Sequence, residues 1–106
     1  LSGVTSYMRE HYREEISLED VASRFGFSST YLSRIFARYI QVNYRTYLTD
    51  LRVNGAVREL LETDHEIGDI AMSHGFADSR AFAQAFRKRY HCLPSFYRKQ
   101  KELKNS

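Results

Sequence analysis

The sequence predicts an all-α protein of about seven helices, arranged as two helix-turn-helix subdomains joined by a long connecting helix. Apolar residues recur at spacings of three and four, and capping residues or glycines separate these helical patterns. The chain has one proline and 5 glycines in 106 residues, so few positions interrupt a helix. DVASRFGF at residues 20–27 returns as DIAMSHGF at residues 69–76, which indicates a duplicated unit. We expect the first subdomain at residues 1–42, the connecting helix at 43–62 and the second subdomain at 63–106.

The first subdomain begins with an amphipathic helix and continues with a helix-turn-helix pattern. Ser17 and Asp20 form a predicted capping box for a short helix that stops at Gly26, and Ser28 caps the next helix. The opening helix presents Val4, Tyr7, Met8 and His11 on one face. The expected core face of the helix after Ser28 consists of Tyr31, Leu32, Ile35, Phe36 and Tyr39.

The connecting helix and the second subdomain follow the same signals. Asn43 caps the connecting helix, and a short helix begins at Asp64 or Glu66 and stops at Gly75. The next helix is capped by Asp78 and presents Phe82 and Phe86 on one face. The last helix is short and has Pro94 in its first turn. We expect residues 101–106, KELKNS, to form a disordered tail.

Charge and cysteine content restrict the class of protein. The net charge is +3, but residues 28–58 hold five basic and one acidic side chain, and residues 79–106 hold eight and one. These basic blocks suit either a polyanionic partner or a solubilising surface. The single cysteine, Cys92, excludes a disulfide framework and is compatible with a reducing compartment. No apolar run approaches the roughly 20 residues that span a membrane.

Each unit consists of a short helix, a glycine turn and a second helix. The second helices are expected at residues 29–40 and 79–90. This is the pattern of a unit whose second helix enters the DNA major groove. Arginine, glutamine, serine and alanine suit contacts with base edges or thymine methyl groups. The expected base-facing residues are Ser29, Thr30, Ser33, Arg34, Ser79, Arg80, Ala83 and Gln84. The expected phosphate contacts, later in these helices, are Arg38, Arg87, Lys88 and Arg89.

The length of the connecting helix suits two recognition helices in one chain. Residues 43–61 of an α-helix span about 29 Å at about 1.5 Å per residue. One turn of B-DNA is about 34 Å, and paired recognition helices lie about one turn apart. We therefore expect one chain to contact two successive major-groove segments of an asymmetric site.

The chain resembles the DNA-binding domain of AraC/XylS-type transcription regulators over nearly its whole length. ISLEDVASRFGFSSTYLSRIF resembles the first unit of that family, YLTDLRVNGAVRELLET its connecting helix, and IGDIAMSHGFADSRAFAQAFRKRYHCLPSFYR its second unit. The resemblance implies seven helices in two homeodomain-like units and binding to double-stranded DNA in the bacterial cytoplasm. It also implies contacts with RNA polymerase, no cofactor, and an effector or dimerisation domain outside this chain.

The chain departs from the family pattern at four places. Gln41 and His91 stand where a glycine usually follows each recognition helix, so we expect strained or remodelled turns. Ala83 and Gln84 replace a common Ser-Arg pair, which suggests that the first unit carries more of the specificity. Leu93 replaces the usual Ser or Thr before the proline and removes a cap.

Other functions fit the sequence less well. His91 and Cys92 lack a second cysteine nearby, and the other histidines do not have zinc-ligand spacing. No nucleophile or phosphate-binding glycine loop accompanies Asp64, Glu66 or Asp69, so we expect neither an enzyme nor a metal site. The alternative function is a helical protein-interaction module with lost or non-specific DNA binding.

Overall fold

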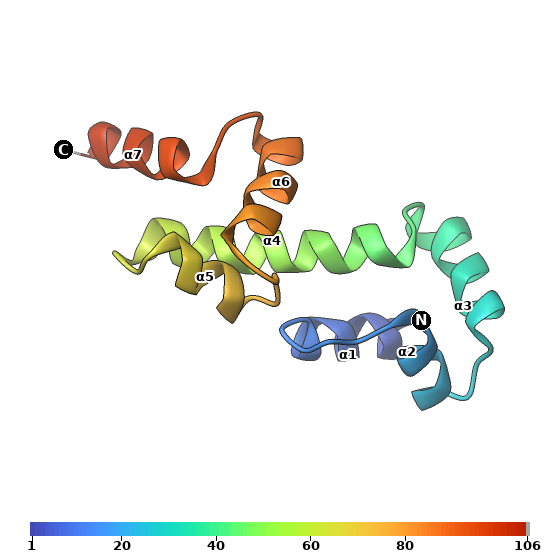
Figure 1. Cartoon of the computed structure of the whole chain (residues 1–106). Coiled ribbons are helices and arrows are strands. Elements are labelled where there is room, and N and C mark those ends of the chain that lie inside the picture. The colour runs from blue at the N-terminus through green and yellow to red at the C-terminus, as the bar shows by residue number, and fades with distance from the viewer. Residues whose placement is uncertain (106) are drawn as a thin grey trace. The chain divides into compact units, whose positions relative to one another are not determined.

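The structure, a computed structural model, describes residues 1–105, in which helices are joined by short turns and loops (Figure 1). It contains seven α-helices and one π-helical turn, η1, and residues 1–105 include no strand. The elements are α1 (Ser2–His11), α2 (Leu18–Arg24), α3 (Ser29–Ile35), η1 (Phe36–Ile40), α4 (Tyr44–Glu62), α5 (Ile67–Ser73), α6 (Ser79–Tyr90) and α7 (Pro94–Asn105). The expected all-α fold with seven helices is confirmed.

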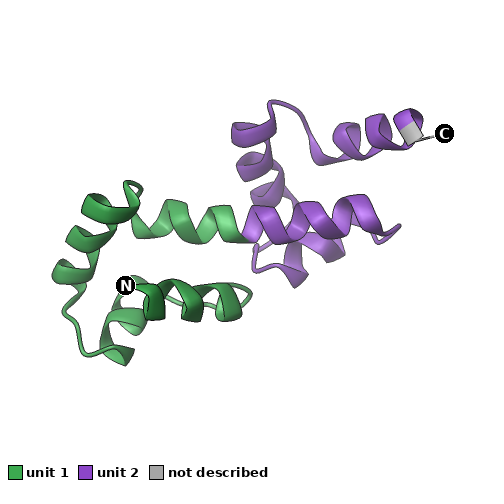
Figure 2. Ribbon diagram, turned by 180° about the vertical axis from the view of Figure 1, so that it is seen from behind, with its two compact units in different colours: residues 1–51 green, residues 52–106 purple. Residues whose placement is uncertain are grey.

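The chain divides into two compact units, residues 1–51 and 52–106, each with its own core (Figure 2). Both units contribute residues to α4, because its first part packs in one core and its second part in the other. The first core contains Val4, Met8, Ile16, Val21, Ala22, Leu32, Phe36, Tyr44 and Leu48. The second core contains Val53, Ala56, Val57, Leu60, Ile70, Ala71, Phe82 and Phe86. Each core therefore joins part of α4 to one helix-turn-helix pair.

Local side-chain caps begin most of these helices where the sequence indicated. The Asp20 N–H donates to Ser17 Oγ at 3.0 Å, and the Ser17 N–H donates back to Asp20 Oδ2 at 3.1 Å. The backbone N–H and then the hydroxyl of Ser17 hold the pKa of Asp20 below its ordinary value. Oxygen atoms of Ser28, Asn43 and Asp78 accept from backbone N–H groups three residues later, at 3.1, 2.8 and 2.8 Å. The predicted caps are thus confirmed.

The ends of four helices use left-handed backbone, which glycine adopts without strain. Gly26 and Gly75 have φ of 75° and 96° after α2 and α5. Gln41 and His91 have φ of 68° and 63° after η1 and α6, although neither is glycine. A Cβ atom in this conformation crowds the backbone. The expectation of strained turns at these two positions is confirmed.

Two sequence-based expectations were wrong. The tail expected to be disordered continues α7 through Asn105, because Lys101, Glu102 and Lys104 are good helix formers and no glycine or proline follows Pro94. Ser106 lies outside the described residues. Tyr31 and Tyr39, expected in the core, are 49% and 63% exposed. Leu32 and Phe36 fill the core instead, whereas Tyr31 of α3 and Tyr39 of η1 remain largely in contact with solvent.

Candidate DNA-binding surface

In the first unit, α3 presents polar side chains opposite its buried anchors. Leu32 and Phe36 are fully buried, and their burial fixes the orientation of α3 and η1 about the helix axis. Of the four predicted base-facing residues, Thr30, Ser33 and Arg34 are exposed, and Ser29 is half-buried. A bidentate guanidinium donor and short hydroxyls are therefore available to a ligand along one stripe.

In the second unit, α6 repeats this arrangement. Phe82 and Phe86 are fully buried and their rings meet edge to face, with centroids 5.8 Å apart. Of the four predicted base-facing residues, Ser79, Arg80 and Gln84 are exposed, and Ala83 is half-buried. The two phenylalanines fill the inner face of the helix. The exposed positions carry polar side chains.

Exposed cations follow on the last turns of both helices. Arg38 lies in η1, and its guanidinium carbon is 5.6 Å from the centroid of the Tyr39 ring. Arg87, Lys88 and Arg89 form the last turn of α6 and are all exposed. Cations here complement the negative end of the helix dipole and are placed where a polyanion can approach. All twelve residues predicted from the sequence therefore lie on α3, η1 or α6, and ten of them are exposed.

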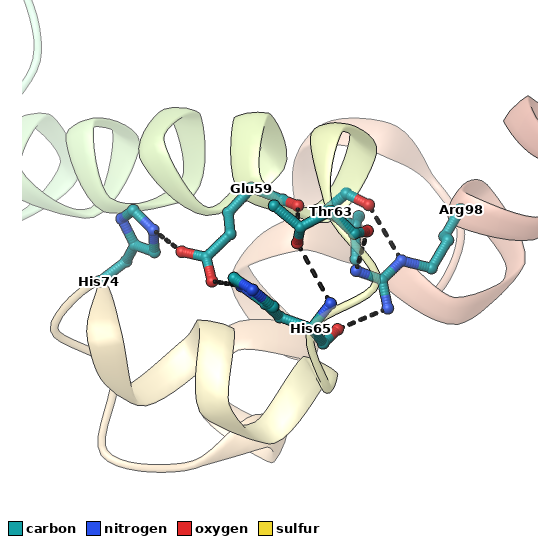
Figure 3. A network of polar contacts seen from close by, with 6 residues as sticks. Glu59, Thr63, His65, His74 and Arg98 are labelled. Carbon is teal, nitrogen blue, oxygen red and sulfur yellow. Dashed lines mark hydrogen bonds and ion pairs between the residues drawn. The ribbon is translucent and has the colours of Figure 1, made fainter.

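A polar network in the second unit was not anticipated from the sequence (Figure 3). Glu59 of α4 holds two imidazoles, with Oε1 2.9 Å from His74 Nε2 and Oε2 2.8 Å from His65 Nδ1. The hydrogen bonds from His65 and then His74 hold the pKa of the Glu59 carboxyl below its ordinary value. His74 is only 2% exposed and ends α5, immediately before the turn to α6. The network thus ties that turn to α4.

Arg98 of α7 completes this network at the end of α4. Its guanidinium donates to the carbonyl oxygens of Leu60, Thr63 and His65 at 2.9, 3.1 and 2.7 Å. The last carbonyls of a helix lack intrahelical partners, and a cation favours that end of the dipole. In the sequence, Arg98 stood out only as the last residue of the segment that resembles the second unit of the family, and its partners are 33 to 38 residues away.

The described part of the chain offers neither a metal site nor a membrane span. Among residues 1–105, no three His, Cys, Asp or Glu side chains are placed to hold a metal ion. No helix in the same part of the chain is both long and apolar enough to cross a bilayer.

Two helix-turn-helix units, each with an anchored second helix and an outer polar stripe, define the class of DNA-binding domains found in transcription regulators. The family model described as "Helix-turn-helix domain" matches residues 21–100. The chain belongs to this family, in its AraC-type branch. Family and fold are those of transcription regulators, which agrees with the expectation that the chain is not an enzyme.

Individual relatives agree with this assignment. The chain is 36% identical over 93 residues to the uncharacterized HTH-type transcriptional regulator YbfP of Bacillus subtilis (strain 168), covering 88% of the chain and 32% of that protein. It is 34% identical over 95 residues to the uncharacterized HTH-type transcriptional regulator SAR0107 of Staphylococcus aureus (strain MRSA252), covering 90% of the chain and 13% of that protein. The chain therefore spans a third or less of the length of these relatives.

Solved structures show the same fold. An AraC-type transcriptional regulator from Chromobacterium violaceum matches with a TM-score of 0.88 and 29% identity, over 95% of this chain and 90% of that one. The DNA-binding domain of AdpA, a global transcriptional factor solved in complex with a target DNA, matches with a TM-score of 0.92 and 25% identity, over 97% and 93%.

Proposed function

We propose that the chain binds duplex DNA sequence-specifically by placing α3 with η1, and α6, in successive major-groove segments. The observation that carries this proposal is the repetition of one arrangement, in which two fully buried anchors face the core and a polar stripe faces outward. The length of α4, 19 residues or about 28 Å at about 1.5 Å per residue, supports a spacing near one DNA turn.

The residues divide by the contacts their chemistry favours. Base edges are contacted from the first turns of each helix, by Ser29, Thr30, Ser33, Arg34, Ser79, Arg80, Ala83 and Gln84. Phosphates are contacted from the later turns, by Arg38, Arg87, Lys88 and Arg89. Arg34 has no counterpart on α6, where Gln84 takes its place, so the first unit supplies more of the base discrimination.

The test is selection of bound duplexes from a pool of randomised sequence, followed by sequencing. Two different motifs about one helical turn apart are expected. Replacing Arg34 by Ala is expected to cost about 1–3 kcal/mol and to relax preference at one base position. Replacing Lys88 by Ala is the matched control, because loss of a phosphate contact weakens all duplexes alike and lowers the salt dependence. Unchanged affinity and preference in Arg34→Ala would contradict the assignment of base contacts to α3.

We also infer that the chain works in the bacterial cytoplasm as part of a longer regulator that contacts RNA polymerase. An effector or dimerisation domain outside residues 1–106 would control it. The greater length of the relatives YbfP and SAR0107 supports this inference. Two-hybrid or pull-down assays of the longer protein against purified RNA polymerase subunits would test it.

A further inference from the structure

The two duplicated units differ at the turn that leads into each recognition helix. At the repeat offset of the two GF motifs, Glu59 and His74 occupy the positions of Glu10 and Phe25. In the first unit, Phe25 packs edge to face on Tyr7, with ring centroids 5.9 Å apart. In the second unit, the imidazole of His74 bonds the Glu59 carboxylate at 2.9 Å. The fold therefore accepts an apolar contact here, and the second unit has an ionisable link instead.

We propose that the Glu59–His74 link positions α6 for base contact by the second unit. This proposal rests on the proposed function, since it assumes that α6 contacts base edges. His74 and Glu59 act as positioning residues, because neither belongs to the polar stripe of α6.

The link is close enough to α6 along the chain to set its position. His74 ends α5, and its N–H donates to Ile70 O at 3.1 Å. Gly75 then turns the chain with φ of 96°, and Asp78 caps α6. Only this short turn separates the anchored imidazole from Ser79, the first residue of α6. A side chain that fixes the turn to α4 therefore fixes the start of the helix, where base contacts need positions within about 0.5 Å.

The chemistry of the link makes it a strong contact. The Glu59 carboxylate only accepts hydrogen bonds, so Nε2 of His74 carries the proton between them. Because the acceptor is an ionised carboxylate, this is a charge-assisted bond, which is roughly twice as strong as one between neutral groups. His65 bonds the other oxygen of Glu59 at 2.8 Å and so helps to hold the carboxylate in place. Loss of the His74 bond is thus expected to loosen the turn.

Two substitutions separate positioning from mere stability. His74→Phe installs the residue that the first unit has at this place, so it keeps the bulk and removes the donor. His74→Gln keeps an N–H donor that does not titrate. Circular dichroism and thermal unfolding of both variants show whether the second unit stays folded. The readout is selection from a pool of randomised duplexes, with affinities then measured on the duplex that the wild type selects.

The expected result is loss of the second motif in His74→Phe, with the first motif intact and affinity about tenfold weaker. His74→Gln is expected to restore the second motif. If His74→Phe does not fold, Glu59→Gln takes its place: it removes the charge from the same hydrogen bond and is expected to weaken preference at the second motif while the first motif stays intact.

Two different failures can be told apart. If the wild type selects two motifs and folded His74→Phe or Glu59→Gln selects the same two with unchanged preference, the positioning role is wrong. If the wild type itself selects only one motif or none, the proposed contact of α6 with bases is wrong, and the link has nothing to position.

Discussion

Replacing Gln41 by Gly is expected to raise the free energy of unfolding of the first unit. Gln41 follows the recognition helix with φ of 68° and ψ of 15°, a left-handed conformation that crowds a Cβ atom. The backbone requires this conformation, because the Gln41 N–H donates to Phe36 O at 2.8 Å to close the π-helical turn. Glycine adopts the same conformation without a Cβ atom.

The size of the effect follows from two opposing contributions. The left-handed conformation costs a residue with a Cβ atom about 1–2 kcal/mol. Glycine lowers the free energy of unfolding by about 0.4–1 kcal/mol, because the unfolded chain has more conformational entropy when it contains glycine. This loss offsets part of the gain. The net gain is therefore about 0.5–1 kcal/mol, or a rise in Tm of about 3–6 °C for a small domain.

Thermal unfolding followed by circular dichroism tests this reasoning, with two matched controls. Gln41→Ala keeps the Cβ atom and is expected to gain nothing. Gly26→Ala is expected to lose about 1 kcal/mol, because Gly26 has φ of 75° and an added Cβ would meet no atom within 4 Å, which leaves backbone strain as the cost. If Gln41→Ala stabilises as much as Gln41→Gly, or Gly26→Ala is neutral, backbone strain is not the cause.

Three further substitutions or conditions have expected outcomes. Arg98→Lys is expected to destabilise the second unit by about 2 kcal/mol, because an ammonium group cannot replace a planar guanidinium that donates to three carbonyls. Chemical denaturation measures this loss, and an unchanged midpoint would contradict it. Asp78→Ala is expected to lower the free energy of unfolding by about 1 kcal/mol through loss of the α6 cap, whereas Asp78→Asn keeps an acceptor and most of the stability. Equal losses in the two variants would show that the charge of Asp78 matters and not its hydrogen bond. The lowered pKa of Glu59 stabilises the folded state above the ordinary pKa of a carboxyl, and this stability is lost as pH falls through the folded-state pKa. Melting curves between pH 7 and pH 3 are therefore expected to fall less steeply in Glu59→Gln than in the wild type, and parallel curves would refute this.

Features governed by neighbouring residues were predictable from the sequence. The caps at Ser17, Ser28 and Asp78 bond residues only three positions later, so their chemistry is local. The strained turns at Gln41 and His91 were predictable because a side chain stands where a glycine usually follows the helix. The buried positions Leu32, Phe36, Phe82 and Phe86 followed from helical spacing in the same way.

Contacts between distant residues were not predictable in this way. Glu59 and His74 are 15 residues apart, and Arg98 meets carbonyls more than 30 residues away, so only the packing of α4, α5 and α7 brings them together. The exposure of Tyr31 and Tyr39 had a similar cause. Helical spacing places them near Leu32 and Phe36, but the neighbouring elements decide where the core ends.

The division of α4 between two cores has a consequence for truncation and for folding. Its early turns supply Tyr44, whose hydroxyl donates to Ile16 O at 2.8 Å, and its later turns supply Val53 and Leu60 to the other core. A peptide ending at residue 42 would therefore lack part of its own interior. Segments this short are marginal as isolated helices in water, so each half of α4 draws stability from its continuation into the other. Cutting the chain between Leu51 and Arg52 would remove this mutual stabilisation of the two halves of α4. The two units would then unfold independently.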